Sequence, residues 1–310
     1  HILLGRQLKK AFLFPKEQEQ KEMPLPFLSS AKSAPGVRIE SKLLTVKYFT
    51  DPICSTCWVV QPALKKMALE YGEYLDMQYY MGGLLPSWET CEGKIKSPSD
   101  AAQHWKDVAV TSNMPIDGDV WFEDPLSSSY PPSIAVKAAQ LQDKEKGILF
   151  LRRIREMIFL EKKNIMRWEN LEMAAFDVGL NMMRFKKDYE GDARAAFQQD
   201  LKLARELQVA SFPTLVFFDG KGNSVRMRGY IYYRDLESAI LQLMPSARKR
   251  EIDPDPGNLF RHFPTMVEEE FALLSNLLRK DARKLLQQLN RHGHIDKIES
   301  SSGVLWKARR

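Results

Sequence analysis

Cysteine is scarce in this sequence, which has three cysteines among 310 residues. Disulfide-stabilised scaffolds are small and rich in cysteine, so this class is excluded. Long apolar runs are also missing, and the longest, such as Leu215–Phe218, extend over only a few residues. Because a membrane span needs about 18 consecutive apolar residues, we expect no transmembrane helix and no membrane partner.

No charge of one sign dominates the chain either. Lys and Arg number 46 against 40 Asp and Glu, which gives a net charge of +6. Dedicated nucleic-acid binders concentrate basic charge more strongly, so the composition disfavours a nucleic-acid partner. A hydrophobic content of 44% with 28% charged residues is typical of a globular chain and excludes disordered and fibrous classes. The length predicts two domains, or one large domain with an appendage.

Residues 1–41 are predicted to form an extended N-terminal arm, because short apolar pieces alternate there with prolines and a polar run. A secretory signal needs a continuous apolar region of about 7–15 residues followed by a cleavage site, and the arm has neither. We therefore expect a cytoplasmic protein.

Two of the cysteines, Cys54 and Cys57, form a CxxC motif in an informative context. A β-rich run over 42–50 precedes the motif, apolar residues at helical spacing follow it, and a second β-run covers 75–81. The order strand, CxxC, helix, strand is typical of a redox motif. At a helix start, unpaired N–H groups and the helix dipole favour an anion, so we expect a lowered pKa for Cys54, with Cys57 as the resolving thiol.

Other interpretations of the pair are open. A structural zinc site needs four Cys or His ligands, but the only other cysteine is Cys91 and the five histidines are scattered, so we predict no metal and no other cofactor. Alternatively, Cys54 and Cys57 are small packing residues inherited from a redox ancestor. The residues alone do not choose between redox chemistry and this packing role.

A second motif lies far downstream, where Ser211-Phe212-Pro213-Thr214 opens an apolar strand. A turn, a return strand over 224–230 and a closing helix over 235–244 follow. Together with the CxxC, this pattern resembles the thioredoxin superfamily. In that superfamily the matching proline is cis and faces the thiols, so the resemblance implies a cis peptide bond between Phe212 and Pro213.

The two motifs are separated by a predicted helical insertion, about 97–207. Helices are expected over 99–110, 131–140, 147–163, 170–181 and 188–208. This insertion resembles the DsbA-like branch, so we predict an α/β, thioredoxin-like (DsbA-like) domain over 42–248. The dipeptide Ser55-Thr56 stands where the oxidant DsbA has Pro-His, and this difference argues against strong oxidase activity.

The C-terminal part is predicted to be a small winged-helix-like α+β domain over 264–310, joined by a linker over 249–263. Two helical patterns, 267–274 and 280–293, precede an alternating hairpin over 295–308. A phosphate-contacting group could lie at the start of the second helix; its members would be Lys280, Arg283 and Lys284. The alternative is a solvated face with i,i+4 charge pairs. The acidic triplet 268–270 favours a structural or protein-contact role, and His292 and His294 are interpreted as turn residues.

Three segments are similar to the SpxH (YjbH) adaptor family of Gram-positive bacteria: 51–58, 82–86 and 211–214. The resemblance implies an adaptor that presents the stress-response transcription factor Spx to the ClpXP protease through ClpX, without turnover chemistry. The family's His- and Cys-rich N-terminal stretch, which is linked to zinc, is not matched, because His1 is the only such residue before Cys54.

The alternative function is a cytosolic thiol–disulfide oxidoreductase that uses Cys54 and Cys57. Partner-binding residues are not assigned by the sequence. Exposed aromatic side chains are candidates for such contacts, with burial in the core as the favoured alternative; the residues concerned are Trp88, Trp105, Trp121 and Trp168.

Overall fold

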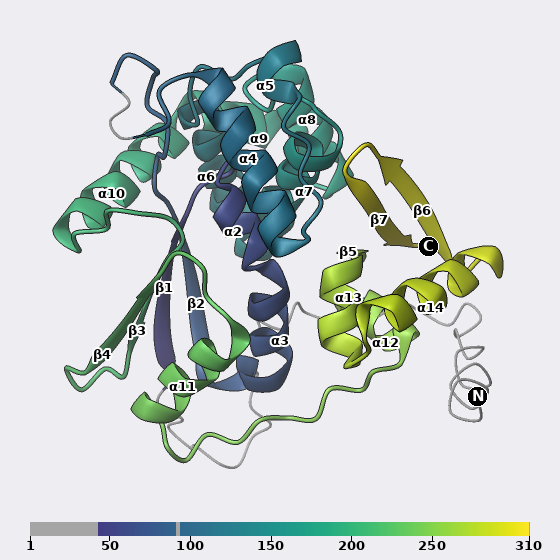
Figure 1. Cartoon of the computed structure of the whole chain (residues 1–310). Helices are drawn as coiled ribbons and strands as arrows, with labels where there is room; N and C mark the ends of the chain where they lie inside the picture. Colours follow the sequence, from purple (N-terminus) through teal and green to yellow (C-terminus); the bar gives the residue numbers. More distant parts are fainter. Residues whose placement is uncertain (1–42, 91–93, 310) are drawn as a thin grey trace, which may run out of the picture.

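The computed structural model of the chain describes residues 43–90 and 94–309. The N-terminal arm expected over 1–41 and the third cysteine, Cys91, lie outside these ranges. Within them, the chain forms a four-stranded sheet, with strands from residues 44–81 and 214–228, and a three-stranded sheet near its C-terminus (Figure 1).

The four-stranded sheet has the order β2-β1-β3-β4. Its strands are β1 (Leu44–Thr50), β2 (Leu75–Met81), β3 (Thr214–Phe218) and β4 (Ser224–Arg228). β1 runs parallel to β2 and antiparallel to β3, and β4 is antiparallel to β3. All four strands were expected from the β-rich runs, and the thioredoxin-like α/β fold is confirmed. Because β1 is an inner strand, Val46, Tyr48 and Phe49 are fully buried.

Helices α2 (Ser55–Val59) and α3 (Gln61–Tyr71) follow β1, and the 3-10 turn η1 (Gly72–Tyr74) leads into β2. Pro62 falls in the first turn of α3, where its missing N–H costs no intrahelical bond, so the helical pattern divides at Val60. α3 and α11 (Tyr233–Leu243) share one hydrophobic core with the sheet.

Between β2 and β3 lies the predicted insertion, whose helices gather at one end of the sheet (Figure 1). They are α4 (Pro98–Ser112), α5 (Val120–Glu123), α6 (Tyr130–Gln142), α7 (Lys144–Leu160), α8 (Trp168–Asp177), α9 (Met182–Glu190) and α10 (Asp192–Glu206). The single helix expected over 188–208 is instead two helices, because Gly191 adopts φ −118°, ψ −108° between α9 and α10. The short α5 was not predicted.

The C-terminal part has the sheet order β5-β7-β6. Its elements are α12 (Pro256–His262), β5 (Thr265–Val267), α13 (Glu268–Ser275), α14 (Arg279–Arg291), β6 (Ile295–Ser300) and β7 (Gly303–Ala308). α12 lies within the segment expected to be a linker and buries Leu259 and Phe260. Thr265 starts a strand paired with β7 rather than a helix. The winged-helix assignment and the domain boundaries stay predictions.

The C-terminal part, residues 256–309, is called the C-terminal segment below, and residues 44–243 are called the body. α13 lies alongside α3 (Figure 1). Val267 and Leu305 enter the core of the inserted helices, and Leu69 of α3 packs on the core of the C-terminal segment. The two parts are therefore joined by shared apolar packing. None of the helices in 43–90 and 94–309 is long and apolar enough to cross a membrane.

Candidate functional site

The CxxC pair lies just beyond the end of β1. The N–H of Cys54 donates to the carbonyl of Asp51 (3.2 Å), and the Cys54 sulfur caps α2 by accepting from the N–H of Cys57 (3.1 Å). Both thiols are free. Cys54 is 4% exposed and Cys57 is fully buried. A reagent in solution would therefore meet Cys54 first.

The expected lowering of the Cys54 pKa is not found. Burial raises the pKa of Cys54 well above its ordinary value, and its hydrogen bond to Cys57 acts in the same direction. Burial also opposes ionisation of Cys57, but a hydrogen bond from Cys54, the charge of Arg155 and a hydrogen bond from Thr50 outweigh it and lower the pKa of Cys57. Desolvation thus overrides the helix start at Cys54, and the inner sulfur is the favoured thiolate.

Arg155, on α7, is a site residue that the sequence analysis missed. Its side chain is 1% exposed, and its Nη2 donates to the Thr50 hydroxyl (2.5 Å) and to the Asp51 carbonyl (3.1 Å). Arg155 follows Leu151 by four residues and precedes Phe159 by four, which places it on the apolar face of the helix. A basic residue on the apolar face of a predicted helix is unusual, and this position is the sequence signal that could have identified Arg155 as a site residue.

Asp51 is a second missed residue, and it ties the thiol loop to its surroundings. One carboxylate oxygen accepts from the N–H of Ile53 (3.0 Å), and the other accepts from the N–H of Leu84 and the hydroxyl of Ser129, both at 2.8 Å. Burial raises the pKa of Asp51 to about 6, although these hydrogen bonds act against the rise. The carboxyl therefore organises three segments around the thiols.

The Phe212–Pro213 peptide bond is cis, in agreement with the sequence-based expectation. β1 and β3 are antiparallel with Phe49 opposite Thr214, so Pro213 lies at the end of the sheet from which the thiol loop departs. Gly82 packs against the same segment, since a Cβ there would come within 2.0 Å of the Phe212 ring. The roles of Cys54, Cys57 and Pro213 as a redox site stay predictions.

His104, on α4, stands beside the dipeptide between the cysteines. Its Nε2 lies 3.4 Å from the hydroxyl of Ser55. Burial lowers the pKa of His104, which favours the neutral imidazole. The structure thus places an imidazole next to the motif from a distant helix.

The four tryptophans belong to the helical core. Trp105 and Trp121 are 3% and 2% exposed, so the hypothesis that they are exposed partner contacts is wrong. Trp88 is half-buried and donates its indole N–H to the Leu126 carbonyl (2.9 Å), and the half-buried Trp168 stacks on Phe185. Burial, the favoured alternative, explains their placement.

The basic residues at the start of α14 are partly neutralised. Arg283 forms an ion pair with Glu268 on α13 (2.7 Å), whereas Lys280 and Lys284 are exposed. The acid and the base stand on different helices, so the expected i,i+4 pairing is not the arrangement here. The rings of His292 and His294 lie 6.5 Å apart. No group of three or more His, Cys, Asp or Glu side chains that could hold a metal occurs in the part of the chain that the structure describes.

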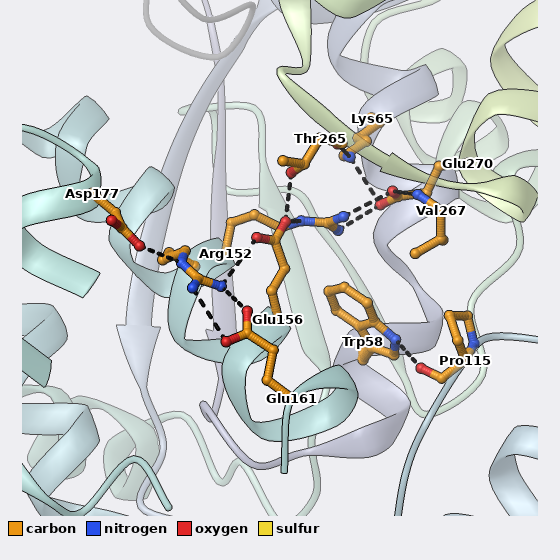
Figure 2. Close-up of polar contacts among 11 residues, drawn as sticks. Trp58, Lys65, Pro115, Arg152, Glu156, Glu161, Asp177, Thr265, Val267 and Glu270 are labelled. Carbon is orange, nitrogen blue, oxygen red and sulfur yellow. Dashed lines mark hydrogen bonds and ion pairs between the residues drawn. The ribbon is translucent and has the colours of Figure 1, made fainter. Parts of the chain in front are cut away.

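A buried charge cluster joins the C-terminal segment to the body (Figure 2). Glu270 of α13 is fully buried and accepts two hydrogen bonds from Arg152 of α7 (2.7 and 3.0 Å). It also forms an ion pair with Lys65 of α3 (2.9 Å). Arg152 also contacts Glu156 (2.7 Å), which accepts from the Thr265 hydroxyl (2.5 Å). Here two cations and two carboxylates, which we call the charge cluster, neutralise one another away from water.

Comparisons with known proteins agree with this architecture. The family model described as Thioredoxin matches residues 48–238. Among solved structures, the cytosolic disulfide reductase DsbM of Pseudomonas aeruginosa has a TM-score of 0.52 at 22% identity, covering 64% of this chain and 96% of its own. A protein disulfide isomerase candidate from Nitrosomonas europaea has a TM-score of 0.55 at 22% identity, covering 66% and 97%. At these identities the likeness shows the fold alone.

Curated relatives cover nearly the whole chain. A protein of Halalkalibacterium halodurans is 32% identical over 272 residues, which is 86% of this chain and 89% of the relative. One of Bacillus subtilis is 31% identical, covering 86% and 90%. Both are named ClpXP adapter protein SpxH, which describes an adapter and not an enzyme. The chain therefore belongs to the SpxH family of ClpXP adapter proteins, built on a thioredoxin-type domain.

Proposed function

We propose that this protein is a cytoplasmic adaptor that binds the transcription factor Spx and promotes its degradation by the ClpXP protease. The observation that carries the proposal is the 32% identity over 89% of a relative named ClpXP adapter protein SpxH. The match extends well beyond the thioredoxin-type region at 48–238. An adaptor acts by raising the effective concentration of its substrate at the protease, and it needs no turnover chemistry.

The state of the thiols supports a binding role over an enzymatic one. A redox enzyme presents an accessible thiolate of lowered pKa. Here Cys54 is 4% exposed with a raised pKa, and the sulfur with the lowered pKa, Cys57, is fully buried.

The test is degradation of purified Spx by reconstituted ClpX and ClpP, with and without this protein. We expect the degradation rate to rise several-fold with the protein present, and we expect Cys54→Ser with Cys57→Ser to retain the stimulation. Lack of stimulation by a protein that is folded by circular dichroism would refute the proposal. Loss of stimulation only in the double Ser variant would show that the adaptor needs thiol chemistry.

A second candidate is a thiol–disulfide oxidoreductase. It is favoured by one arrangement, namely a CxxC at the end of β1 beside a cis Phe212–Pro213 bond. This function predicts turnover of a model disulfide substrate that disappears in Cys54→Ser. Absence of turnover, with stimulated proteolysis of Spx, would reject this second candidate.

A further inference from the structure

The thiol pair and the C-terminal segment are connected through a single turn of α7. Arg152, Arg155 and Glu156 lie within five consecutive residues of this helix. Arg155 donates to Thr50 and to the Asp51 carbonyl beside the thiols. Arg152 and Glu156 reach in the other direction, to Glu270 and Thr265 of the C-terminal segment. A movement of this part of α7 at the thiol loop would therefore also move the residues that contact the C-terminal segment.

Trp58 supplies a direct contact between the two sites. It follows Cys57 immediately and is fully buried, and its N–H donates to the carbonyl of Cys54 (3.1 Å). The guanidinium of Arg152 lies 4.4 Å from the centre of its ring, so Arg152 is held between Trp58 and Glu270 (Figure 2). The ring of Phe159 stacks on Trp58 as well. Trp58 thus contacts both the CxxC turn and the charge cluster.

A second contact runs from Trp58 to the turn between β6 and β7. The indole N–H of Trp58 donates to the carbonyl of Pro115 (3.0 Å). Pro115 packs under Gly303, where an added Cβ would come within 2.7 Å of the proline ring, and nearby Asp117 accepts from the hydroxyl of Ser301. The residue that follows the thiols is therefore linked to two parts of the C-terminal segment, α13 and the turn between β6 and β7.

We propose that the contact Trp58–Arg152–Glu270 couples the redox state of the Cys54–Cys57 pair to the docking of the C-terminal segment on the body. The contacts described above join a dithiol pair to a docked segment, and in this proposal the docked arrangement belongs to the dithiol form. Oxidation joins the Cys54 sulfur, which accepts from the Cys57 N–H, to the Cys57 sulfur, and it removes the thiolate charge that the pair can offer to Arg155. By thermodynamic reciprocity, a loosened segment favours the disulfide and a disulfide loosens the segment.

The redox step uses a small disulfide such as oxidised glutathione. Cys54 is the more exposed thiol, and it reacts after losing its proton to solvent, although burial raises its pKa and keeps this thiolate the minor one. The thiolate attacks one sulfur of the small disulfide, and the other sulfur leaves as a thiolate that takes up a proton. Cys57 then attacks the Cys54 sulfur of the mixed disulfide, and the second small thiol leaves. The two protein thiols are oxidised and give up two protons, and the small disulfide is reduced to two thiols that receive them.

The experiment uses the full chain with Cys91→Ser, so that only Cys54 and Cys57 report. The equilibrium constant for their oxidation is measured in glutathione buffers by acid quenching, alkylation and mass spectrometry. Glu270→Gln weakens the docking contact, and Glu299→Gln is the matched control because it removes an exposed carboxylate of the same segment. We expect Glu270→Gln to shift the constant at least about fivefold towards the disulfide, and Glu299→Gln to leave it within twofold.

Hydrogen exchange gives the reciprocal measurement. We expect amides of residues 265–275 to exchange faster in the disulfide form of the otherwise wild-type chain than in the dithiol form. A constant for Glu270→Gln within twofold of the control, or a shift towards the dithiol, overturns the proposal. If Glu270→Gln does not fold, hydrogen exchange decides alone, and equal protection in the two redox forms then overturns it.

Discussion

Replacing Glu270 by Ala tests whether the charge cluster holds the C-terminal segment in place. Glu270 is fully buried and is the carboxylate that both Lys65 and Arg152 contact, at 2.9 and 2.7 Å. When Glu270 is removed, Glu156 is the one carboxylate of the charge cluster left to balance the two cations, Lys65 and Arg152. Breaking a buried ion pair from one side costs about 3–5 kcal/mol, because the remaining charge stays desolvated.

The pKa of Lys65 determines where in this range the free-energy cost of Glu270→Ala should fall. Burial lowers it to about 8 and the charge of Arg152 acts in the same direction, against the attraction of Glu270. Without Glu270, Lys65 would lose its proton near neutral pH, which limits the cost to the lower part of that range. The destabilisation should therefore shrink as the pH rises through about 8, where Lys65 becomes neutral in the wild-type chain too.

The assay is urea unfolding followed by circular dichroism at pH 7 and pH 9. We expect the free energy of unfolding of Glu270→Ala to fall by about 3 kcal/mol at pH 7 and by less at pH 9. Glu299→Ala, in an exposed pair with Lys297, should cause no measurable change. A loss below about 1 kcal/mol at pH 7, or a loss that grows with pH, would refute the reasoning.

Three further predictions concern the thiol site. Gly82→Ala should destabilise the fold by about 1–3 kcal/mol, because its Cβ would lie 2.0 Å from the Phe212 ring; an unchanged urea midpoint would contradict this. Asp51 has a folded pKa raised to about 6, so its contribution to stability is complete below the unfolded value near 4 and is lost as the pH rises through 6. The stability advantage of wild type over Asp51→Asn should therefore decline between pH 4 and pH 6.5, and a constant difference would argue against a titrating Asp51. Alkylation of Cys54 by iodoacetamide should be slow at pH 7 and accelerate above pH 9, since burial raises its pKa; a plateau reached below pH 8 would contradict that direction.

Much of the fold could be predicted from local sequence signals. Alternating and apolar runs marked the four strands of the main sheet, and Ser211-Phe212-Pro213-Thr214 indicated the cis bond through its resemblance to thioredoxins. The break at Gly191 and the strand at Thr265 were not predicted. The first depends on one backbone conformation within a helical pattern, and the second depends on pairing with β7, far along the chain.

The candidate site was predicted only in part, for a related reason. The spacing of Cys54 and Cys57 is visible in one short segment, whereas the burial that raises the Cys54 pKa comes from packing of the whole fold. Arg152 and Glu270 look like ordinary charged residues of amphipathic helices until α7 and α13 meet. Charge pairing between distant helices leaves no periodic trace, and such contacts therefore had to come from the structure.

The buried face between the body and the C-terminal segment affects how truncated forms would behave. A chain cut before residue 256 would present Lys65 and Arg152 to solvent beside the apolar surface that Val267 and Leu305 cover in the intact protein. Because this apolar surface would be exposed to solvent, the truncated chain would tend to self-associate and to be cleaved by proteases. Lost activity in a deletion variant would then report damage to the remaining body as much as the absence of a binding module, whereas point substitutions on the outer face of α14 would keep the two effects apart.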